Sequence, residues 1–281
     1  MSSYRFCRTD DIGLLVDALN RCWAPYFPDE PAMTPAAFKR TIRDLQVWCS
    51  SCMVAFSGPD PIGVLIGAKR PYGTLVHKIA VHPDHRRQGH ARHLLDSLGS
   101  KLAILGPPRI VAEVPDTFDH AFALFTAGGY VEEARFTDYV LKREDEDVQE
   151  MADRYVIPVT VDDLAANDLL GAPHPPVCWE RSVETLTARK DDITGLAVAS
   201  DERIEAYLLY MKDGEILSLR SFIDDGGARL KLLLSRLRGG GTRTFRFPKV
   251  HPAELSQACL ESLGFRPAGG HRLCVARASP G

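Results

Sequence analysis

A basic, glycine-containing hexapeptide, Arg86-Arg87-Gln88-Gly89-His90-Ala91, has the clearest chemical meaning in this sequence. It follows an apolar stretch over 74–81 that predicts a buried strand, which Pro83 ends because proline cannot donate to a ladder. The apolar spacing after Gly89 predicts a helix that runs to Leu105. Unpartnered amides at a helix start, the helix dipole and two guanidinium groups together favour an anion such as a diphosphate.

These residues resemble the acetyl-CoA signature of the GNAT N-acetyltransferase superfamily, which reads Arg or Gln, two residues, Gly, one residue, then Gly or Ala. Arg86, Gly89 and Ala91 fill its fixed positions, and the preceding Ile79-Ala80-Val81-His82-Pro83 is also similar to the family. The resemblance covers roughly residues 4–142 and implies acetyl-CoA as the acyl donor. It further implies that the cofactor contacts the backbone of Ile79, Ala80 and Val81 and the loop residues Arg86, Arg87, Gln88, Gly89, His90, Ala91 and Arg92.

Acyl transfer from a thioester to an amine needs a base, because the amine arrives mostly protonated. Alternation along the strand before the hexapeptide predicts one face made up of Leu75, His77, Ile79 and Val81. Imidazole titrates in the useful pH range, so His77 is the first candidate for the base. Glu113, on the neighbouring strand, is the second. The alternatives are that His77 is a core histidine whose hydrogen bonds are satisfied and that Glu113 faces solvent.

The helix expected over 119–127 departs from the family's pattern. The family often has Asn at its start, Phe-Tyr within it and Gly-Phe at its end, whereas this chain has Phe118, Leu124-Phe125 and Gly129-Tyr130. The family's tyrosine is usually assigned to protonating the departing thiolate, and Phe125 has no hydroxyl. Because a thiol of pKa ~8.5 is a tolerable leaving group and water can supply the proton, the departure does not exclude catalysis.

The acceptor is expected to contact the aromatic segment Trp23-Ala24-Pro25-Tyr26-Phe27-Pro28. In the family, the segment between the first two helices helps to wall the acceptor site, so Trp23, Tyr26 and Phe27 are the candidates. A loop packed on the core is the alternative. The sequence indicates no broad acidic or basic docking surface, which favours a small-molecule amine over a nucleic-acid-bound or histone acceptor.

Two groups of residues have the side chains of metal ligands. Four histidines lie close together in sequence: His82, His85, His90 and His93. The arginines among them oppose a divalent ion and favour a phosphate, so we expect no metal there. Cys49 and Cys52 form a CxxC that leads into a strand, without a second pair for zinc. We expect buried thiols, with a redox or zinc role as the alternative.

The composition indicates a globular protein of two domains. The chain has 281 residues, a formal net charge of −3, 45% hydrophobic residues and 25% charged residues, and about 100–200 residues per domain is usual. This charge argues against nucleic acid or an anionic membrane as the main partner. No apolar run approaches the ~20 residues of a membrane span, and no signal-peptide pattern opens the chain. We expect a cytoplasmic protein, monomeric or homodimeric.

The order of predicted elements repeats once along the chain. The first copy reads strand 4–8, helix 9–20, helix 34–45, strands 52–56, 62–69 and 74–81, helix 91–105, strand 109–113, helix 119–127, strands 130–134 and 137–142. The second reads strands 193–199, 204–211 and 215–222, helix 229–237, strand 242–247 and helix 252–263. We expect an α/β (α+β) fold, GNAT-like, duplicated, with a mixed, mostly antiparallel sheet flanked by helices. The domains are a GNAT domain at 1–143, an acidic linker at 144–156 and a degenerate GNAT-like domain at 157–281.

The second copy has lost the diphosphate chemistry. Its Gly226-Gly227-Ala228-Arg229 is similar to Gly89-His90-Ala91-Arg92 of the first copy. In this alignment Ile223 stands at the position of Arg86, and Asp224 and Asp225 stand at the next two positions. Carboxylates repel a diphosphate at close range, so the second copy is not expected to bind CoA.

Together these features predict an acyl-CoA-dependent N-acyltransferase that passes acetyl from acetyl-CoA to an amine of a small molecule by direct attack. The missing tyrosine and the degenerate second copy suggest an alternative from another class. That alternative is a non-catalytic acyl-CoA-binding sensor or partner-binding module.

Overall fold

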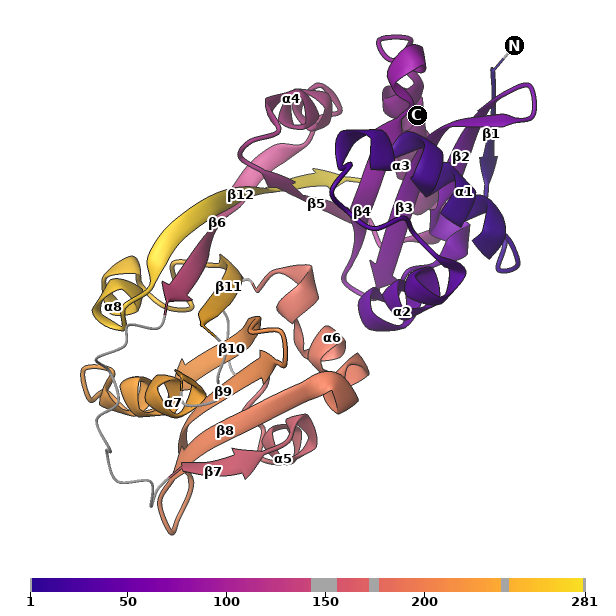
Figure 1. Cartoon of the computed structure of the whole chain (residues 1–281). Helices are drawn as coiled ribbons and strands as arrows, with labels where there is room; N and C mark the ends of the chain where they lie inside the picture. The colour runs from indigo at the N-terminus through magenta and orange to yellow at the C-terminus, as the bar shows by residue number, and fades with distance from the viewer. Residues whose placement is uncertain (1, 143–155, 172–176, 239–242, 280–281) are drawn as a thin grey trace. The chain divides into compact units, whose positions relative to one another are not determined.

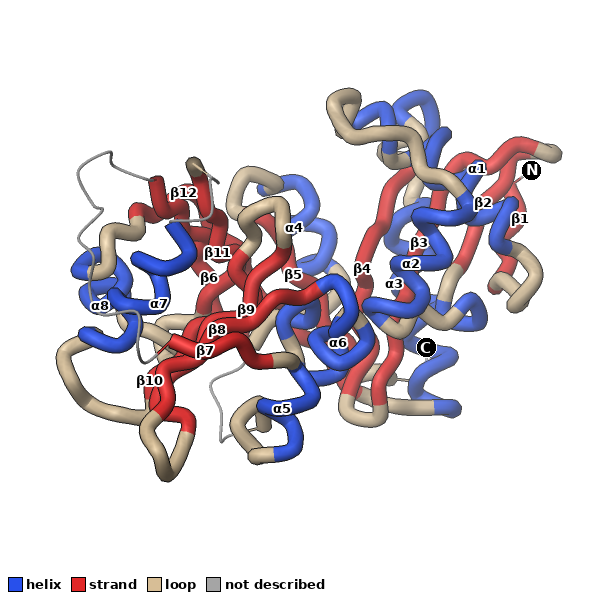
Figure 2. Tube along the Cα trace, turned by 60° about the horizontal axis from the view of Figure 1, so that its bottom comes forward, coloured by secondary structure: helices blue, strands red, loops and turns tan. Residues whose placement is uncertain are grey.

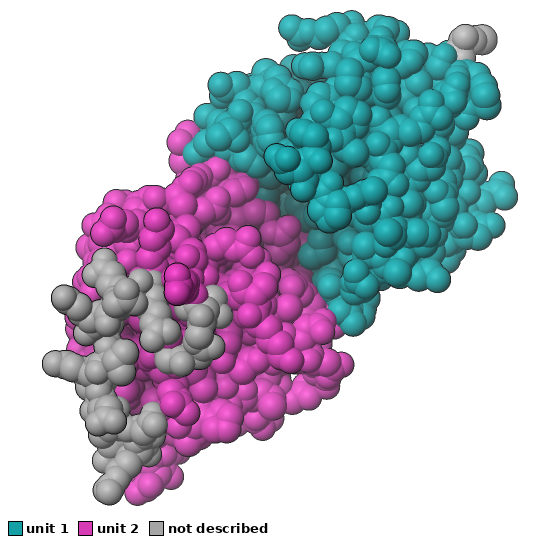
Figure 3. All heavy atoms as spheres, viewed as in Figure 1, with its two compact units in different colours: residues 1–134, 272–281 teal, residues 135–271 magenta. Residues whose placement is uncertain are grey.

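The computed structural model describes residues 2–142, 156–171, 177–238 and 243–279 (Figure 1). The chain forms two compact units, Met1–Ala134 with Arg272–Gly281, and Arg135–His271 (Figure 3). This division differs from the predicted domains, because the last residues of the chain belong to the first unit. The predicted acidic linker, 144–156, lies outside the described residues except for its final position.

Unit 1 begins with a strand and two helices, as predicted. Its elements up to the first hairpin are β1 (Ser2–Phe6), α1 (Ile12–Cys22), the 3-10 helix η1 (Ala24–Tyr26), α2 (Pro35–Leu45), the 3-10 helix η2 (Cys49–Ser51), β2 (Met53–Ser57) and β3 (Asp60–Arg70). The hydroxyl of Thr34 accepts the amide of Ala37 and caps α2, with Pro35 in the first turn. Helix α1 begins later than the predicted residue 9, because Asp11 precedes it, and Asp11 makes no side-chain cap bond.

Unit 1 continues with the strand and helix that carry the hexapeptide. Its further elements are β4 (Gly73–Val81), the 3-10 helix η3 (Pro83–His85), α3 (His90–Leu105), β5 (Arg109–Pro115), α4 (Asp119–Ala127) and the start of β6 (Val131–Lys142). Phe118 precedes α4 and makes no side-chain cap bond. The two strands predicted over 130–134 and 137–142 are one continuous strand.

The first sheet contains antiparallel pairs on both sides of the parallel pair of β4 with β5. Its order is β1-β2-β3-β4-β5-β12-β6-β11, where β12 is Arg266–Arg277 (Figure 1). The meander β2-β3-β4 is antiparallel, as predicted. β5 runs parallel to β4, and among the described residues their pairing is confined to Thr74 with Ile110 and Leu75 with Val111. Beyond these positions the two strands separate.

β4 contains a bulge that the sequence pattern did not predict. Lys78 pairs with Ile66 and Val76 pairs with Gly67, so His77 is an extra residue on this strand. Ile79, opposite Leu65, therefore shares a face with Val76, whereas Leu75, opposite Ala68, lies on the other face. The predicted single face of Leu75, His77, Ile79 and Val81 is wrong, since strict alternation does not continue through a bulge.

One hydrophobic cluster of unit 1 lies between α3, α4 and one face of this sheet, and α1 and α2 bury further apolar side chains such as Leu15 and Phe38. The cluster includes Leu94, Leu98 and Leu102 of α3 and Phe125 of α4. Cys274 of β12 is buried in the same cluster, although it lies at the far end of the chain. The last strand of the sequence therefore completes the core of the first unit.

Unit 2 repeats the pattern with shorter helices (Figure 2). Its elements are β7 (Val156–Val159), α5 (Val161–Ala166), the 3-10 helices η5 (Trp179–Arg181) and η6 (Lys190–Asp192), α6 (Val183–Ala188), β8 (Ile193–Ala199), β9 (Ile204–Met211), β10 (Ile216–Ser221), α7 (Ala228–Arg238), β11 (Thr244–Val250) and α8 (Gln257–Ser262). The second sheet has the order β10-β9-β8-β7, and β11 pairs with β6. The helix predicted over 252–263 is shorter than expected. None of the helices in the described ranges has both the length and the apolarity required to span a bilayer.

Candidate active site

The loop between β4 and α3 presents open backbone amides at a helix start. Gly89 precedes the helix with φ of 84°, a left-handed conformation that favours glycine, and no side chain caps the first turn. Arg87 is also left-handed, at φ 61°, which turns the backbone tightly around the loop. The side chains of Arg86, Arg87 and Gln88 are exposed. Unpaired amides beside two guanidinium groups suit an anion, as the sequence predicts.

The other predicted loop residues lie beneath or beside this surface. His90 is buried, and its Nδ1 is hydrogen-bonded to the Tyr4 hydroxyl at 2.7 Å. Burial and the neighbouring His85 and His93 lower the pKa of His90, so its imidazole is neutral and only its amide lies at the loop. Arg92 pairs with Asp96 at 2.9 Å on the exposed side of α3. The half-buried Ala91 keeps the first turn narrow.

The edge of β4 that faces away from β3 offers backbone groups to a ligand. The His82 amide donates to the Ile62 carbonyl at 2.9 Å, so by alternation the backbone groups of Ala80 also point toward β3. Those of Ile79 and Val81 point to the opposite side, where β4 and β5 have separated. The carbonyl of Val81 accepts the hydroxyl of Tyr26 at 2.7 Å.

Both predicted base candidates flank this separation of the strands. His77 is the half-buried extra residue of the β4 bulge, and Glu113 is half-buried on β5. Each is the second residue after the last pair of the two strands, Leu75 with Val111. The topology thus brings a histidine and a carboxylate to the same level of two diverging strands.

The predicted acceptor segment forms an aromatic cluster with residues that the sequence did not single out. The rings of Trp23 and Phe27 stack at 4.4 Å and 18°, and the Nζ of Lys78 lies 3.9 Å from the Trp23 ring centre. The indole Nε1 donates to Glu30 at 3.2 Å, and the same carboxylate oxygen lies 3.7 Å from Lys78 Nζ. The indole is thereby held by a ring, an ammonium group and a carboxylate.

Phe27 extends this cluster to the loop before α4. Its ring meets that of Phe118 edge to face at 5.5 Å, so the segment after α1 and the loop after β5 are in contact. The only sequence signal for Lys78 is its position beside Ile79, and its orientation toward this segment depends on the bulge at His77. Glu30 carries no distinctive motif.

The cysteine pair and the α4 phenylalanine are part of the interior. Cys49 and Cys52 lie at the two ends of a 3-10 turn, and burial raises the pKa of both thiols. Protonated, buried thiols are poor nucleophiles and poor metal ligands, which agrees with the expected buried role.

Phe125 is 3% exposed and packs against Tyr130 with ring centres 5.0 Å apart.

The equivalent loop of unit 2 is filled by its own carboxylate. Helix α7 begins at Ala228 after Gly227, whose φ of 84° equals that of Gly89. The counterpart of Gly89 is therefore Gly227, and the predicted alignment of Gly226 with Gly89 is wrong by one residue. The Asp225 carboxylate accepts the amides of Gly227 at 3.0 Å and Arg229 at 3.1 Å.

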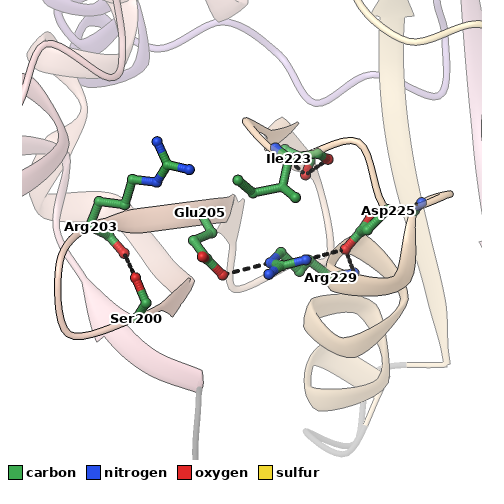
Figure 4. Close-up of polar contacts among 8 residues, drawn as sticks. Ser200, Arg203, Glu205, Ile223, Asp225 and Arg229 are labelled. Atoms are coloured by element: carbon green, nitrogen blue, oxygen red, sulfur yellow. Dashed lines mark hydrogen bonds and ion pairs between the residues drawn. The ribbon is translucent and has the colours of Figure 1, made fainter.

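A guanidinium group completes this arrangement in unit 2. Arg229 donates to Asp225 at 2.7 Å and to Glu205 at 2.7 Å (Figure 4). The amides at the start of α3 have no side-chain acceptor, whereas the equivalent amides at the start of α7 donate to the carboxylate of Asp225. The two helix starts share a left-handed glycine, at Gly89 and Gly227, and differ in their electrostatic state.

Comparisons with known proteins agree with this geometry. Residues 14–130 match the family model described as acetyltransferase (GNAT) family. The fold is similar to that of a GCN5-related N-acetyltransferase from Sphaerobacter thermophilus, with a TM-score of 0.68 and 14% identity over 100% of this chain and 96% of that chain. It is also similar to a tandem GNAT protein from the clavulanic acid biosynthesis pathway, with a TM-score of 0.63 and 18% identity over 100% of both chains.

A further similar structure is a GCN5-related N-acetyltransferase from Anabaena variabilis. It has a TM-score of 0.67 and 12% identity over 99% of this chain and 73% of that chain. At these identities the structural likenesses show the fold. The predicted duplicated α/β fold is confirmed.

Proposed function

We propose that this chain, which carries a GNAT acetyltransferase domain, transfers acetyl from acetyl-CoA to the amine of a small molecule at unit 1. The observation that carries the proposal is the uncapped, left-handed turn at Gly89, flanked by two arginines and next to the separated strands β4 and β5. A cofactor such as CoA fits this combination, because its diphosphate can accept hydrogen bonds from the helix amides and its narrow chain can pair with the open strand edge. The filled loop at Asp225 supports cofactor binding in unit 1 alone.

The residues of unit 1 have separate tasks in this proposal. The amides after Gly89, with Arg86 and Arg87, would hold the diphosphate, and the backbone groups of Ile79 and Val81 would hold the amides of the arm. Acetyl-CoA, when bound, supplies a thioester whose C–S bond breaks as the new C–N amide bond forms. The separation of β4 from β5 gives room for the reacting group beside His77 and Glu113.

The proton balance requires a base and a proton source. His77 or Glu113, directly or through water, would take a proton from the ammonium group of the acceptor, because only the neutral amine has a lone pair for attack, and the nitrogen would lose a second proton to water as the amide forms. The sulfur leaves as a thiolate, which water can protonate, since Phe125 has no hydroxyl. Trp23, Phe27 and Phe118 would form an apolar wall for a small acceptor, with Lys78 and Glu30 as its charged groups.

Calorimetric titration with CoA tests the cofactor half of this proposal. Arg86→Glu reverses a charge at the proposed diphosphate position, and loss of a charged hydrogen bond is expected to weaken CoA binding by about 10- to 100-fold. Arg40→Glu makes the same charge change on the exposed face of α2 and should leave CoA affinity unchanged. Equal affinities in the two variants would contradict the assignment of the loop.

A panel of small amines tests the transfer itself. Release of free CoA from acetyl-CoA, dependent on one class of amine, is the expected result for the wild-type chain. Tight CoA binding without turnover on any amine would instead support a non-catalytic acyl-CoA sensor.

A further inference from the structure

Tyr26 makes contacts that a residue of the acceptor wall does not need. It is the last residue of η1, and its hydroxyl donates to the Val81 carbonyl at 2.7 Å. Its ring lies 5.7 Å from the guanidinium carbon of Arg86, within the range of a cation–π interaction. One side chain therefore touches both the end of the β4 edge and the first arginine of the anion loop.

These contacts matter because Arg86 is exposed and would otherwise be flexible. Ordering a free arginine side chain costs rotamer entropy. A guanidinium that already rests on an aromatic face has lost part of this freedom before the ligand arrives, so a smaller cost remains at binding. The burial of Tyr26, which raises the pKa of its hydroxyl, keeps that hydroxyl protonated and able to donate to Val81.

We propose that Tyr26 is a positioning residue for the cofactor rather than a wall of the acceptor site. Its ring holds Arg86 in the orientation that meets the diphosphate, and its hydroxyl fixes η1 to the end of β4. This inference rests on the proposed binding of CoA at the Gly89 loop. The ring and the hydroxyl have separable roles, which makes the inference testable.

A double-mutant cycle on CoA affinity separates positioning from general structural support. Tyr26→Leu removes the aromatic face and is expected to weaken CoA binding by about 2- to 5-fold, the usual value of an exposed cation–π contact. Tyr26→Phe keeps the face and removes only the hydroxyl bond to Val81, so its loss of CoA affinity should be smaller than that of Tyr26→Leu. In an Arg86→Ala background, Tyr26→Leu should cause no further loss, because the ring acts through Arg86. Tyr72→Leu, in the turn between β3 and β4, is the matched control and should not change the affinity.

Each result bears on the inference. Equal losses from Tyr26→Leu in both backgrounds would show mere structural support and overturn it, as would an unchanged affinity of Tyr26→Leu or a loss in Tyr26→Phe as large as that in Tyr26→Leu. Should the Leu variant unfold at a lower temperature than the wild type, Tyr26→Met, which is of similar length and has no aromatic face, takes its place. Failure of the wild type to bind CoA would overturn the proposed function as well, whereas normal wild-type binding with no effect at Tyr26 overturns this inference alone.

Discussion

His77 and Glu113 lie at the same level of two diverging parallel strands, each the second residue after the last pair, Leu75 with Val111. A β-bulge makes His77 an extra residue of β4 relative to β3. Bulges redirect side chains, and they are common next to active sites. The two candidate bases of unit 1 therefore lie at one level of the sheet, on neighbouring strands.

The pH dependence of transfer distinguishes these candidates. A base acts when deprotonated, so kcat/KM falls as the pH drops through its pKa, which is ordinarily about 6.5 for histidine and about 4.3 for glutamate. We expect His77→Ala to lower kcat by about 10²- to 10⁴-fold and to remove the limb near neutrality, with CoA affinity retained. Glu113→Gln should leave that limb in place. An unchanged pH–rate profile in His77→Ala would remove His77 from the mechanism.

The carboxylate that fills the unit 2 loop should contribute to stability rather than to binding. Desolvation acts to raise the pKa of Asp225, but the hydrogen bonds from Arg229 and from the amides of Arg229 and Gly227 outweigh it and lower the pKa. A lowered carboxyl pKa means that the stabilisation is present above the unfolded-state pKa, about 3.9 for Asp, and is lost as the pH falls through the folded-state pKa.

Asp225→Ala is therefore expected to lower the free energy of unfolding by about 1–3 kcal/mol at pH 7, because the half-buried amide and guanidinium donors lose a charged acceptor. The difference from the wild type should shrink as the pH falls below about 4. Urea unfolding followed across this pH range measures both effects, with Asp201→Asn in the exposed turn between β8 and β9 as the control. A constant difference at all pH values would contradict a role of the charge.

Local patterns were sufficient to predict most individual elements. The bounds predicted for α2, α4, β8 and β9 agree with the structure to within one residue. Each is marked by features that act over a few residues, such as the Thr34-Pro35 start of α2 or the paired glycines after Ala127. The strand, turn and helix around the hexapeptide were also predictable, because they follow one another directly in the sequence.

Features that depend on distant parts of the chain were not predictable from one sequence. The bulge at His77 is a matter of register with β3, and no periodicity marks it. The contact of Tyr26 with Val81 joins residues 55 positions apart, so its aromatic character suggested a substrate wall instead. The division into units differs from the predicted boundary for the same reason, since the linker was placed at 144–156 on the acidic composition of that part of the sequence.

The C-terminal strand offers a test of how the first unit is built. Cys274 is 1% exposed in the core of unit 1, and burial raises the pKa of its thiol to about 11, so it is neutral there. Cys274→Asp places a charge in this core and is expected to cost more than about 3 kcal/mol of stability. CoA binding should be lost with it, although position 274 is remote from Arg86 in sequence. Arg277→Asp, at an exposed position of the same strand, is the control. Thermal unfolding and CoA titration measure both effects, and a stable Cys274→Asp variant that binds CoA normally would show that unit 1 does not need this strand.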